Sequence, residues 1–189
     1  MSTNIMIVGV GGQGSLLASK LLGRLVLNQG LDVKVSEVHG MSQRGGNVVT
    51  YVKFGERVYS PVITRGEADF IVSFETLEAA RWVDCLRPDG RIIVSTQEIS
   101  PMPVLTGQAK YPDNLIGMMR ERGIPVDAVD GLALAALAGS PKAVNLVLMG
   151  VLSKYFPFPE SDWLTAMEET VPAKVLELNK TAFALGRNL

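Results

Sequence analysis

Hydrophobic and polar positions alternate between two periods along the chain, which predicts strands and helices in turn. Short runs rich in β-branched and other apolar residues are typical of strands buried on both faces, and they occupy residues 4–10, 32–37, 68–74, 91–96 and 125–129. Apolar residues at three- and four-residue spacing are typical of helices, and these segments lie at 15–30, 76–86, 113–123 and 142–156. The alternation predicts a mainly parallel sheet with helices on both faces.

Two segments depart from this alternation. In "NVVTYVKFGERVYSPVI", residues 47–63, two alternating β-rich runs flank a short "GE" step. This pattern predicts an antiparallel hairpin, inserted after the second strand at an edge of the sheet. The tail from Asp162 to Gly186 predicts a long amphipathic helix, interrupted or restarted at Pro172.

Length and composition indicate one domain. A chain of 189 residues with 47% hydrophobic content builds one substantial core, and neither an internal repeat nor a linker divides it. We therefore expect a single domain over residues 1–189, an α/β Rossmann-like three-layer sandwich with a C-terminal helix. The mean hydropathy of +0.23 also fits an obligate subunit interface.

The net charge, the lengths of the apolar runs, and the single cysteine and histidine argue against several kinds of partner and cofactor. A formal net charge of −1 without charge blocks argues against nucleic acid or an anionic membrane as a partner. No apolar run approaches the roughly 18 residues of a membrane span, and no signal peptide precedes the first strand, so we expect a cytoplasmic protein. One cysteine, Cys85, and one histidine cannot supply the roughly four ligands of a zinc or iron–sulfur site. The chain alone should bind no metal, and any redox centre must lie on another chain.

The stretch "IVGVGGQGS", residues 7–15, carries the first candidate chemistry. Gly9, Gly11 and Gly14 fit G-x-G-x-x-G between a predicted strand and a predicted helix, where free N–H groups can receive an anion. Glu37 stands at the end of the second strand, where an acid would hold a ribose. These residues predict a dinucleotide site. The alternative is that the glycines only let the backbone pass through a tight turn.

A second glycine-bearing loop, "SEVHGMSQRGGNV" at residues 36–48, follows the second strand. It should meet the first loop at the carboxyl-end rim of the sheet, where open α/β sheets bind ligands. Arg44 offers a planar fork for phosphate or carboxylate, although it could equally be a solvated charge or a partner for Glu37. His39 is the only histidine. It could act as an acid, a base or a simple hydrogen-bonding residue.

Three segments in this order, "GVGGQG", "EVHGMSQRGG" and "NLVLMGVL", resemble the gamma-type domain of the 2-oxoacid:ferredoxin oxidoreductases. This family acts on pyruvate, ketoisovalerate or indolepyruvate, and the indolepyruvate type is the most similar. The resemblance implies a complex that oxidatively decarboxylates a 2-oxoacid to acyl-CoA and CO2 and reduces ferredoxin. Thiamine diphosphate, Mg and the iron–sulfur clusters would be held by a larger partner subunit, and coenzyme A would be the acyl acceptor.

The resemblance also implies which residues form a rim facing a ligand or the partner, while no catalytic residue is assigned. From the first loop and the second strand these are Gly9, Gly11, Gly12, Gln13, Gly14 and Glu37. From the second loop they are His39, Gly40, Gln43, Arg44, Gly45 and Gly46. Many relatives have an aromatic residue at the position of His39, which leaves its role open. Asn145 is secondary: it is either a buried amide satisfied by backbone or also a residue that shapes the rim.

Three functions remain as alternatives. The first is a non-autonomous subunit of a 2-oxoacid:ferredoxin oxidoreductase, active only with its partner. The second is a free NAD(P)-dependent oxidoreductase, but the chain shows neither a Tyr-x-x-x-Lys pair nor a histidine with an obvious acid. The third is a ligand-sensing or assembly module, which differs from the first only in its partner. The resemblance favours the first, and the identity of the 2-oxoacid stays open.

Overall fold

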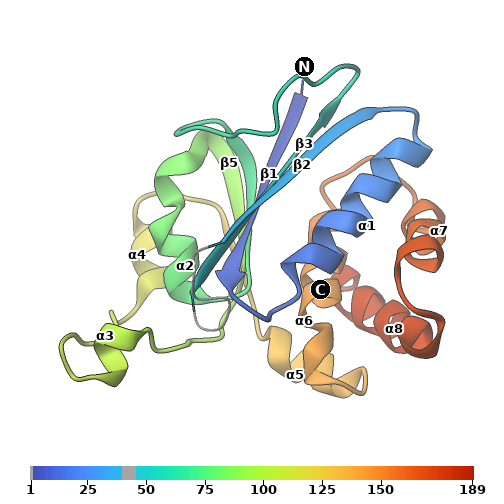
Figure 1. Ribbon diagram of the computed structural model, residues 1–189. Coiled ribbons are helices and arrows are strands. Elements are labelled where there is room, and N and C mark those ends of the chain that lie inside the picture. Colours follow the sequence, from blue (N-terminus) through green and yellow to red (C-terminus); the bar gives the residue numbers. More distant parts are fainter. Residues whose placement is uncertain (1, 40–45) are drawn as a thin grey trace.

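The computed structural model describes residues 2–39 and 46–189 (Figure 1). In this part of the chain a six-stranded sheet has the order β2-β3-β1-β4-β5-β6. Its strands are β1 (Ser2–Val10), β2 (Asp32–His39), β3 (Asn47–Gly55), β4 (Ala68–Ser73), β5 (Leu86–Ser95) and β6 (Val126–Val129). Strands β1, β4, β5 and β6 run parallel, whereas β3 is antiparallel to both of its neighbours. Because continuous apolar runs can be buried on both faces, β1 forms the centre of this sheet.

Helices cover both faces of the sheet and make it a three-layer sandwich. The α-helices are α1 (Ser15–Asn28), α2 (Thr76–Arg81), α3 (Met102–Leu105), α4 (Leu115–Glu121), α5 (Gly131–Leu137), α6 (Val144–Ser153), α7 (Glu160–Thr170) and α8 (Leu176–Arg187). Short 3-10 turns lie at Val83–Cys85, Pro141–Ala143 and Ala173–Val175. One apolar cluster joins Ile5 and Ile7 of β1 to α1 and α6, and the other joins Met6 and Val8 to the face of α2 and α4. The predicted fold class is confirmed.

The predicted hairpin at residues 47–63 is wrong. Its first run forms β3, but the second forms no strand, although Val58 and Ile63 are buried in the connection to β4. Nor does β3 lie at an edge, because it is inserted between β2 and β1. The second run contains Pro61, which cannot donate a hydrogen bond to a neighbouring strand.

The second predicted strand is not buried on both faces as expected. Strand β2 lies at the edge of the sheet, and Val35 and Val38, which point to opposite faces, are 44% and 54% exposed. The extra strand β3 moves β2 to the edge of the sheet, where α1 covers it only in part.

The C-terminal region forms the predicted interrupted helix. Helix α7 ends at Thr170 and α8 begins at Leu176, on either side of Pro172. Helices α6 and α8 approach closely, because a Cβ on Gly150 would lie 2.1 Å from the backbone oxygen of Phe183. Only glycine fits there. The pair supports the sheet from the same side as α1 (Figure 1).

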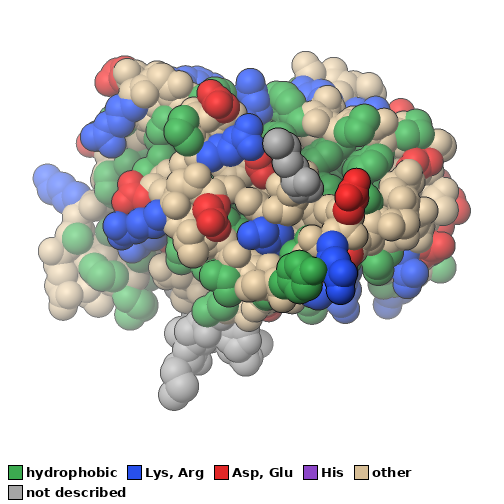
Figure 2. Space-filling view, turned by 90° about the horizontal axis from the view of Figure 1, so that it is seen from above, with side chains coloured by type: hydrophobic (Ala, Val, Ile, Leu, Met, Phe, Trp, Pro, Cys, Tyr) green, Lys and Arg blue, Asp and Glu red, His purple; other side chains and the backbone are tan. Residues whose placement is uncertain are grey.

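Figure 2 shows the end of the molecule at which β1 begins. Lysine and arginine side chains are interspersed with aspartate and glutamate on this face, so no large patch of one sign is visible (Figure 2). An electrostatic surface for a polyanion would need such a patch.

Candidate functional site

The turn between β1 and α1 needs glycine at three positions for different reasons. Gly12 and Gly14 have φ angles of +100° and +90°, in the left-handed region that favours glycine. Gly9 is in the strand, but a Cβ there would lie 2.8 Å from Oε1 of Gln13 and 3.1 Å from the ring of Phe74. Of the three G-x-G-x-x-G positions, Gly9 is therefore restricted by close contact and Gly14 by its backbone angle. Gly12, between them, is restricted by its backbone angle although it is not part of the motif.

Gln13 ties the glycine turn to the rest of the rim. Its Oε1 accepts a hydrogen bond from the backbone N–H of Val10 at 2.7 Å. Its Nε2 donates to the carbonyl of Phe74 and to Oε1 of Gln97, both at 3.1 Å. One side chain thus connects the carboxyl end of β1 to the segments that follow β4 and β5.

Asn145 supports the turn from α6. It is only 3% exposed, and its Nδ2 donates to the carbonyl of Gly14 at 3.3 Å while its Oδ1 accepts from the N–H of Leu146 at 2.9 Å. A Cβ on Gly14 would lie 2.6 Å from this Nδ2. Asn145 is therefore a backbone-satisfied buried amide that also contacts the predicted rim.

The first glycine loop contacts Gly46, the last glycine of the second loop, at the carboxyl end of β1. The N–H of Gly11 donates to the carbonyl of Gly46 at 3.0 Å. Glu37 is exposed, and its Oε2 accepts from the hydroxyls of Ser15 at 3.1 Å and Thr50 at 3.2 Å.

The structure therefore brings Gly9, Gly11, Gly12, Gln13, Gly14, Glu37, Gly46 and Asn145 together. Of the remaining predicted residues, Gly40, Gln43, Arg44 and Gly45 lie outside the described residues. The backbone of His39 ends β2 opposite Val48.

Two hollows flank the glycine turn and share Gly12 and Gly14. One, of about 410 Å³, is also lined by Ser15 and Glu37. The other, of about 450 Å³, includes Gln13, Gln97, Lys142 and Asn145 among its lining residues. The first hollow thus carries an acidic side chain and the second a basic one, so the two could receive different ligand groups.

The inserted strand changes what the glycine fingerprint can do. In a dinucleotide-binding fold the acid that holds the ribose follows the strand next to β1. Here β3 takes that place, and β2 with Glu37 lies two strand spacings away, roughly 10 Å. The N–H of Gly11, moreover, is already bonded to Gly46. Both facts weigh against the NAD(P) hypothesis.

A buried carboxylate near the rim was missed by the sequence analysis. Glu75, directly after β4, is 1% exposed and accepts hydrogen bonds from the N–H groups of Glu78 at 2.8 Å and Ile99 at 3.1 Å, and from the hydroxyl of Tyr111. Burial and the bond to Glu75 raise the pKa of Tyr111 above its usual range. The signal available was an acidic residue between a buried strand and a helix, the position of an N-cap.

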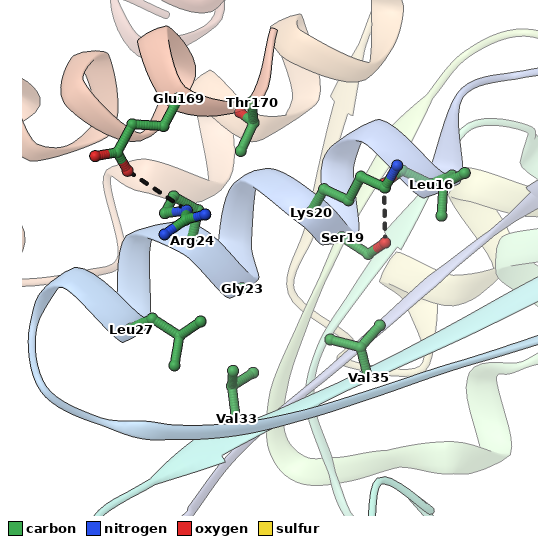
Figure 3. Close-up of a pocket in the computed structure, with 10 residues that line it drawn as sticks. All are labelled: Leu16, Ser19, Lys20, Gly23, Arg24, Leu27, Val33, Val35, Glu169 and Thr170. Atoms are coloured by element: carbon green, nitrogen blue, oxygen red, sulfur yellow. Dashed lines mark hydrogen bonds and ion pairs between the residues drawn. The ribbon is translucent and has the colours of Figure 1, made fainter.

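A larger hollow, about 510 Å³, lies between α1 and β2 (Figure 3). Its walls include the apolar side chains of Leu16, Leu27 and Val35. Two of the polar groups drawn there are paired: Arg24 lies 3.5 Å from Glu169, and the Ser19 hydroxyl donates to the Leu16 carbonyl at 3.1 Å. Lys20 adds one further charged side chain to the wall. A binding site needs convergent polar groups that are available to a ligand, so we place the site at the glycine turn.

Metal and membrane features were also sought in the described ranges. Across residues 2–39 and 46–189, no group of three or more His, Cys, Asp or Glu side chains could hold a metal ion. In the same part of the chain, no helix has the length and apolar character needed to cross a membrane.

Comparison with known proteins identifies the family. Residues 4–189 match the family described as pyruvate ferredoxin/flavodoxin oxidoreductase. The chain belongs to this family. Indolepyruvate oxidoreductase subunit IorB of Thermococcus kodakarensis is 43% identical over 188 residues, covering 97% of this chain and 93% of that protein. The subunit IorB of Archaeoglobus fulgidus is 40% identical over 195 residues, covering 100% of this chain and 95% of that protein.

A solved structure has the same fold. The gamma subunit of a keto/oxoacid ferredoxin oxidoreductase from Geobacter sulfurreducens superposes with a TM-score of 0.73 at 20% identity. The match covers 98% of this chain and 96% of that one. The predicted family and the predicted gamma-type fold are both confirmed.

Proposed function

We propose that this chain is the non-autonomous, gamma-type subunit of a 2-oxoacid:ferredoxin oxidoreductase that acts on indolepyruvate or a related arylpyruvate. The complex would oxidatively decarboxylate the 2-oxoacid to acyl-CoA and CO2 while reducing ferredoxin. The observation that carries the proposal is the 43% identity to an indolepyruvate oxidoreductase subunit along nearly the whole of both chains. The single domain over residues 1–189 is part of the same proposal.

The chain's own residues do not fit an iron–sulfur cluster. A cluster takes about four thiolates, whereas the one cysteine, Cys85, is buried in the core on the α2 face. Burial raises the pKa of its thiol, which disfavours the thiolate that a metal needs. We therefore assign the clusters, and with them thiamine diphosphate and Mg, to a larger partner subunit.

What this chain contributes is the rim around the glycine turn. Helix α1 begins there with no acidic residue in its first turn, so its free N–H groups and positive dipole end are available to an anion. Gly12, Gln13 and Glu37 surround that position. The rim would bind and orient an anionic group, either a coenzyme A phosphate or a carboxylate, at the mouth of the partner's active site.

The second loop completes this proposed rim. Gly40, Arg44 and Gly45 are assigned to it by resemblance, and His39 and Gln43 by their side-chain chemistry. The hydrogen bond between Gly11 and Gly46, the last glycine of this segment, supports the proposal. Arg44 would bind the anion with its guanidinium, since this group can contact phosphate or carboxylate in a bidentate manner.

The test is reconstitution. The purified chain is supplied with indolepyruvate, coenzyme A, thiamine diphosphate, Mg and a low-potential viologen acceptor, with and without the large thiamine-bearing subunit of the same organism. We expect viologen reduction only when both subunits are present. Turnover by this chain alone, or failure of the two subunits to associate, would refute the proposal.

A further inference from the structure

A projecting arm leaves the body between β5 and α4. No residue from 98 to 113 is buried, and Figure 1 shows α3, at the tip of this segment, lying clear of the sheet and the other helices. Two large apolar side chains are exposed on α3, Met102 by 66% and Leu105 by 68%. These two residues are three positions apart and so lie on the same face of α3, and exposed apolar side chains that lie together can mark an interaction surface.

The arm is uncharged and stiff at its tip. The eleven residues "ISPMPVLTGQA", 99–109, contain no Asp, Glu, Lys or Arg, and the buried centres of protein interfaces are depleted of charge in the same way. Pro101 and Pro103 restrict the backbone. The carbonyl of Pro103 accepts hydrogen bonds from the N–H groups of Gln108 at 2.8 Å and Ala109 at 3.0 Å. The loop is therefore folded on itself, which lowers the entropy lost when it binds.

One buried carboxylate holds both ends of the arm. Oε1 of Glu75 accepts from the N–H of Ile99 at 3.1 Å, where the arm begins, and from the hydroxyl of Tyr111, where it ends. The same hydroxyl accepts from the N–H of Leu77 at 3.0 Å. A buried carboxylate is unfavourable unless it is fully bonded, and Glu75 meets this condition by fixing the neck of the arm. The tip is held in place without being packed.

The arm starts at the candidate site. Gln97, one residue before its first position, accepts the hydrogen bond from Gln13 at 3.1 Å. Its carbonyl also accepts from the N–H of Thr76 at 3.0 Å. A partner that covers the glycine turn would therefore also lie beside the base of the arm.

We propose that this arm docks the large partner subunit of the oxidoreductase, with Met102 and Leu105 entering an apolar recess beside the active site that the rim completes. This inference rests on the proposed function, because the occupant is the subunit assigned there. The arm's origin on the site-bearing rim favours that subunit over a second copy of this chain. The arm is a positioning element and touches no reacting atom.

The test measures association separately from folding. The double variant Met102→Asp with Leu105→Asp is titrated calorimetrically against the purified large subunit, beside the wild type. The matched control is Val62→Asp, which is 54% exposed in the connection between β3 and β4 at the opposite end of the sheet. We expect the double variant to lose at least about tenfold in affinity, which corresponds to 1.4 kcal/mol. The control should bind like the wild type, and neither variant should lower the Tm, because no altered side chain is buried.

The outcomes separate the two proposals. If the wild-type chain does not bind the large subunit, the proposed function fails and the assignment of the arm fails with it. If the wild type binds and the double variant binds equally well, the arm assignment alone is refuted. If the wild type forms a dimer, the double variant is monomeric, and both bind the large subunit equally well, the arm is a self-association surface instead. If viologen reduction by the mixed subunits is weak with the double variant and returns when that variant is added in excess, the arm acts by docking on the large subunit.

Discussion

Replacing Gln13 with alanine tests whether its amide holds the rim together. The substitution leaves the Val10 N–H without its acceptor at 2.7 Å and the Phe74 carbonyl without its donor at 3.1 Å. It also removes the bond to Gln97. Net contributions of about 1 kcal/mol per hydrogen bond predict a loss of about 2–3 kcal/mol for these partly buried groups. For a chain of this size the Tm should fall by about 4–12 °C.

A second substitution at the same position, Gln13→Glu, separates size from hydrogen-bonding chemistry. One carboxylate oxygen can still accept from Val10, but the other faces the carbonyl of Phe74 and Oε1 of Gln97, where the amide donated. A carboxylate oxygen that faces these two oxygen acceptors is repelled by them, which disfavours the ionised form of the introduced glutamate. The pKa of its carboxyl should therefore be raised in the folded state. The stability deficit is therefore largest at neutral pH, and it should shrink as the pH falls towards about 4.3, the value in the unfolded chain.

Urea unfolding of the purified subunit at pH 7.5 and pH 4.5 measures both effects. The control is Gln97→Ala, which removes one contact of Gln13 while the backbone bond of Gln97 to Thr76 remains, so it should lose only about 0.5–1.5 kcal/mol. Ordinary surface substitutions change the free energy of unfolding by no more than about 0.5 kcal/mol. If Gln13→Ala stays within that range of the wild type, the hydrogen bonds of Gln13 do not stabilise the rim. If the loss of unfolding free energy in Gln13→Glu grows at low pH, the assignment of Oε1 as the acceptor and Nε2 as the donor of Gln13 is refuted.

Four further measurements concern Tyr111, the NAD(P) hypothesis, Glu78 and Arg44. Tyr111→Phe removes the hydroxyl that bonds Glu75, so trypsin should cleave after Lys110 several times faster; an unchanged rate would mean that the neck does not depend on this bond. Calorimetry should show no micromolar affinity for NAD or NADP because β3 separates β1 from β2, whereas micromolar binding would restore the dehydrogenase hypothesis. Burial raises the pKa of Glu78, and its Oε2 has no hydrogen-bond partner among the described residues. Glu78→Gln should therefore stabilise the subunit at pH 8, and the gain should vanish below about pH 4, where the wild-type acid is protonated. Arg44→Ala should keep the Tm but lower kcat/KM for coenzyme A or the 2-oxoacid by roughly ten- to a hundredfold, and an unfolded variant would instead make Arg44 a structural residue.

Most elements could be predicted from the sequence because buried parallel strands and amphipathic helices each have a local signature. Residues 5–8 of β1, 70–72 of β4 and 92–94 of β5 are continuous apolar runs, and Pro172 marks the break between α7 and α8. The strand order could not be predicted in the same way. Both halves of residues 47–63 alternate like strands, and only pairing with distant segments decides that the first half lies between β1 and β2. Tertiary context overrides local propensity in such cases.

The candidate site was predictable only in its outline. The glycine turn and its Gln13 stand out in the sequence, and the structure brings them beside Glu37 and Gly46. The pair of Glu75 and Tyr111 is 36 residues apart in the chain, and no local pattern indicates that the two side chains meet. A buried carboxylate is recognisable only once its donors are placed around it.

The glycine fingerprint itself shows why a motif can predict a fold and still suggest the wrong ligand. Gly9 is restricted by Gln13 and Phe74, and Gly14 by Asn145, so contacts within the protein account for these two glycines without any bound cofactor. In a dinucleotide fold the same glycines let the backbone approach a pyrophosphate. The features that distinguish the two cases are therefore Gln13 and Asn145, whose amides contact the turn, together with β3, which separates β2 from β1. A turn with these three features is held by the protein's own side chains, which agrees with the proposed role of the rim beside a partner subunit's active site.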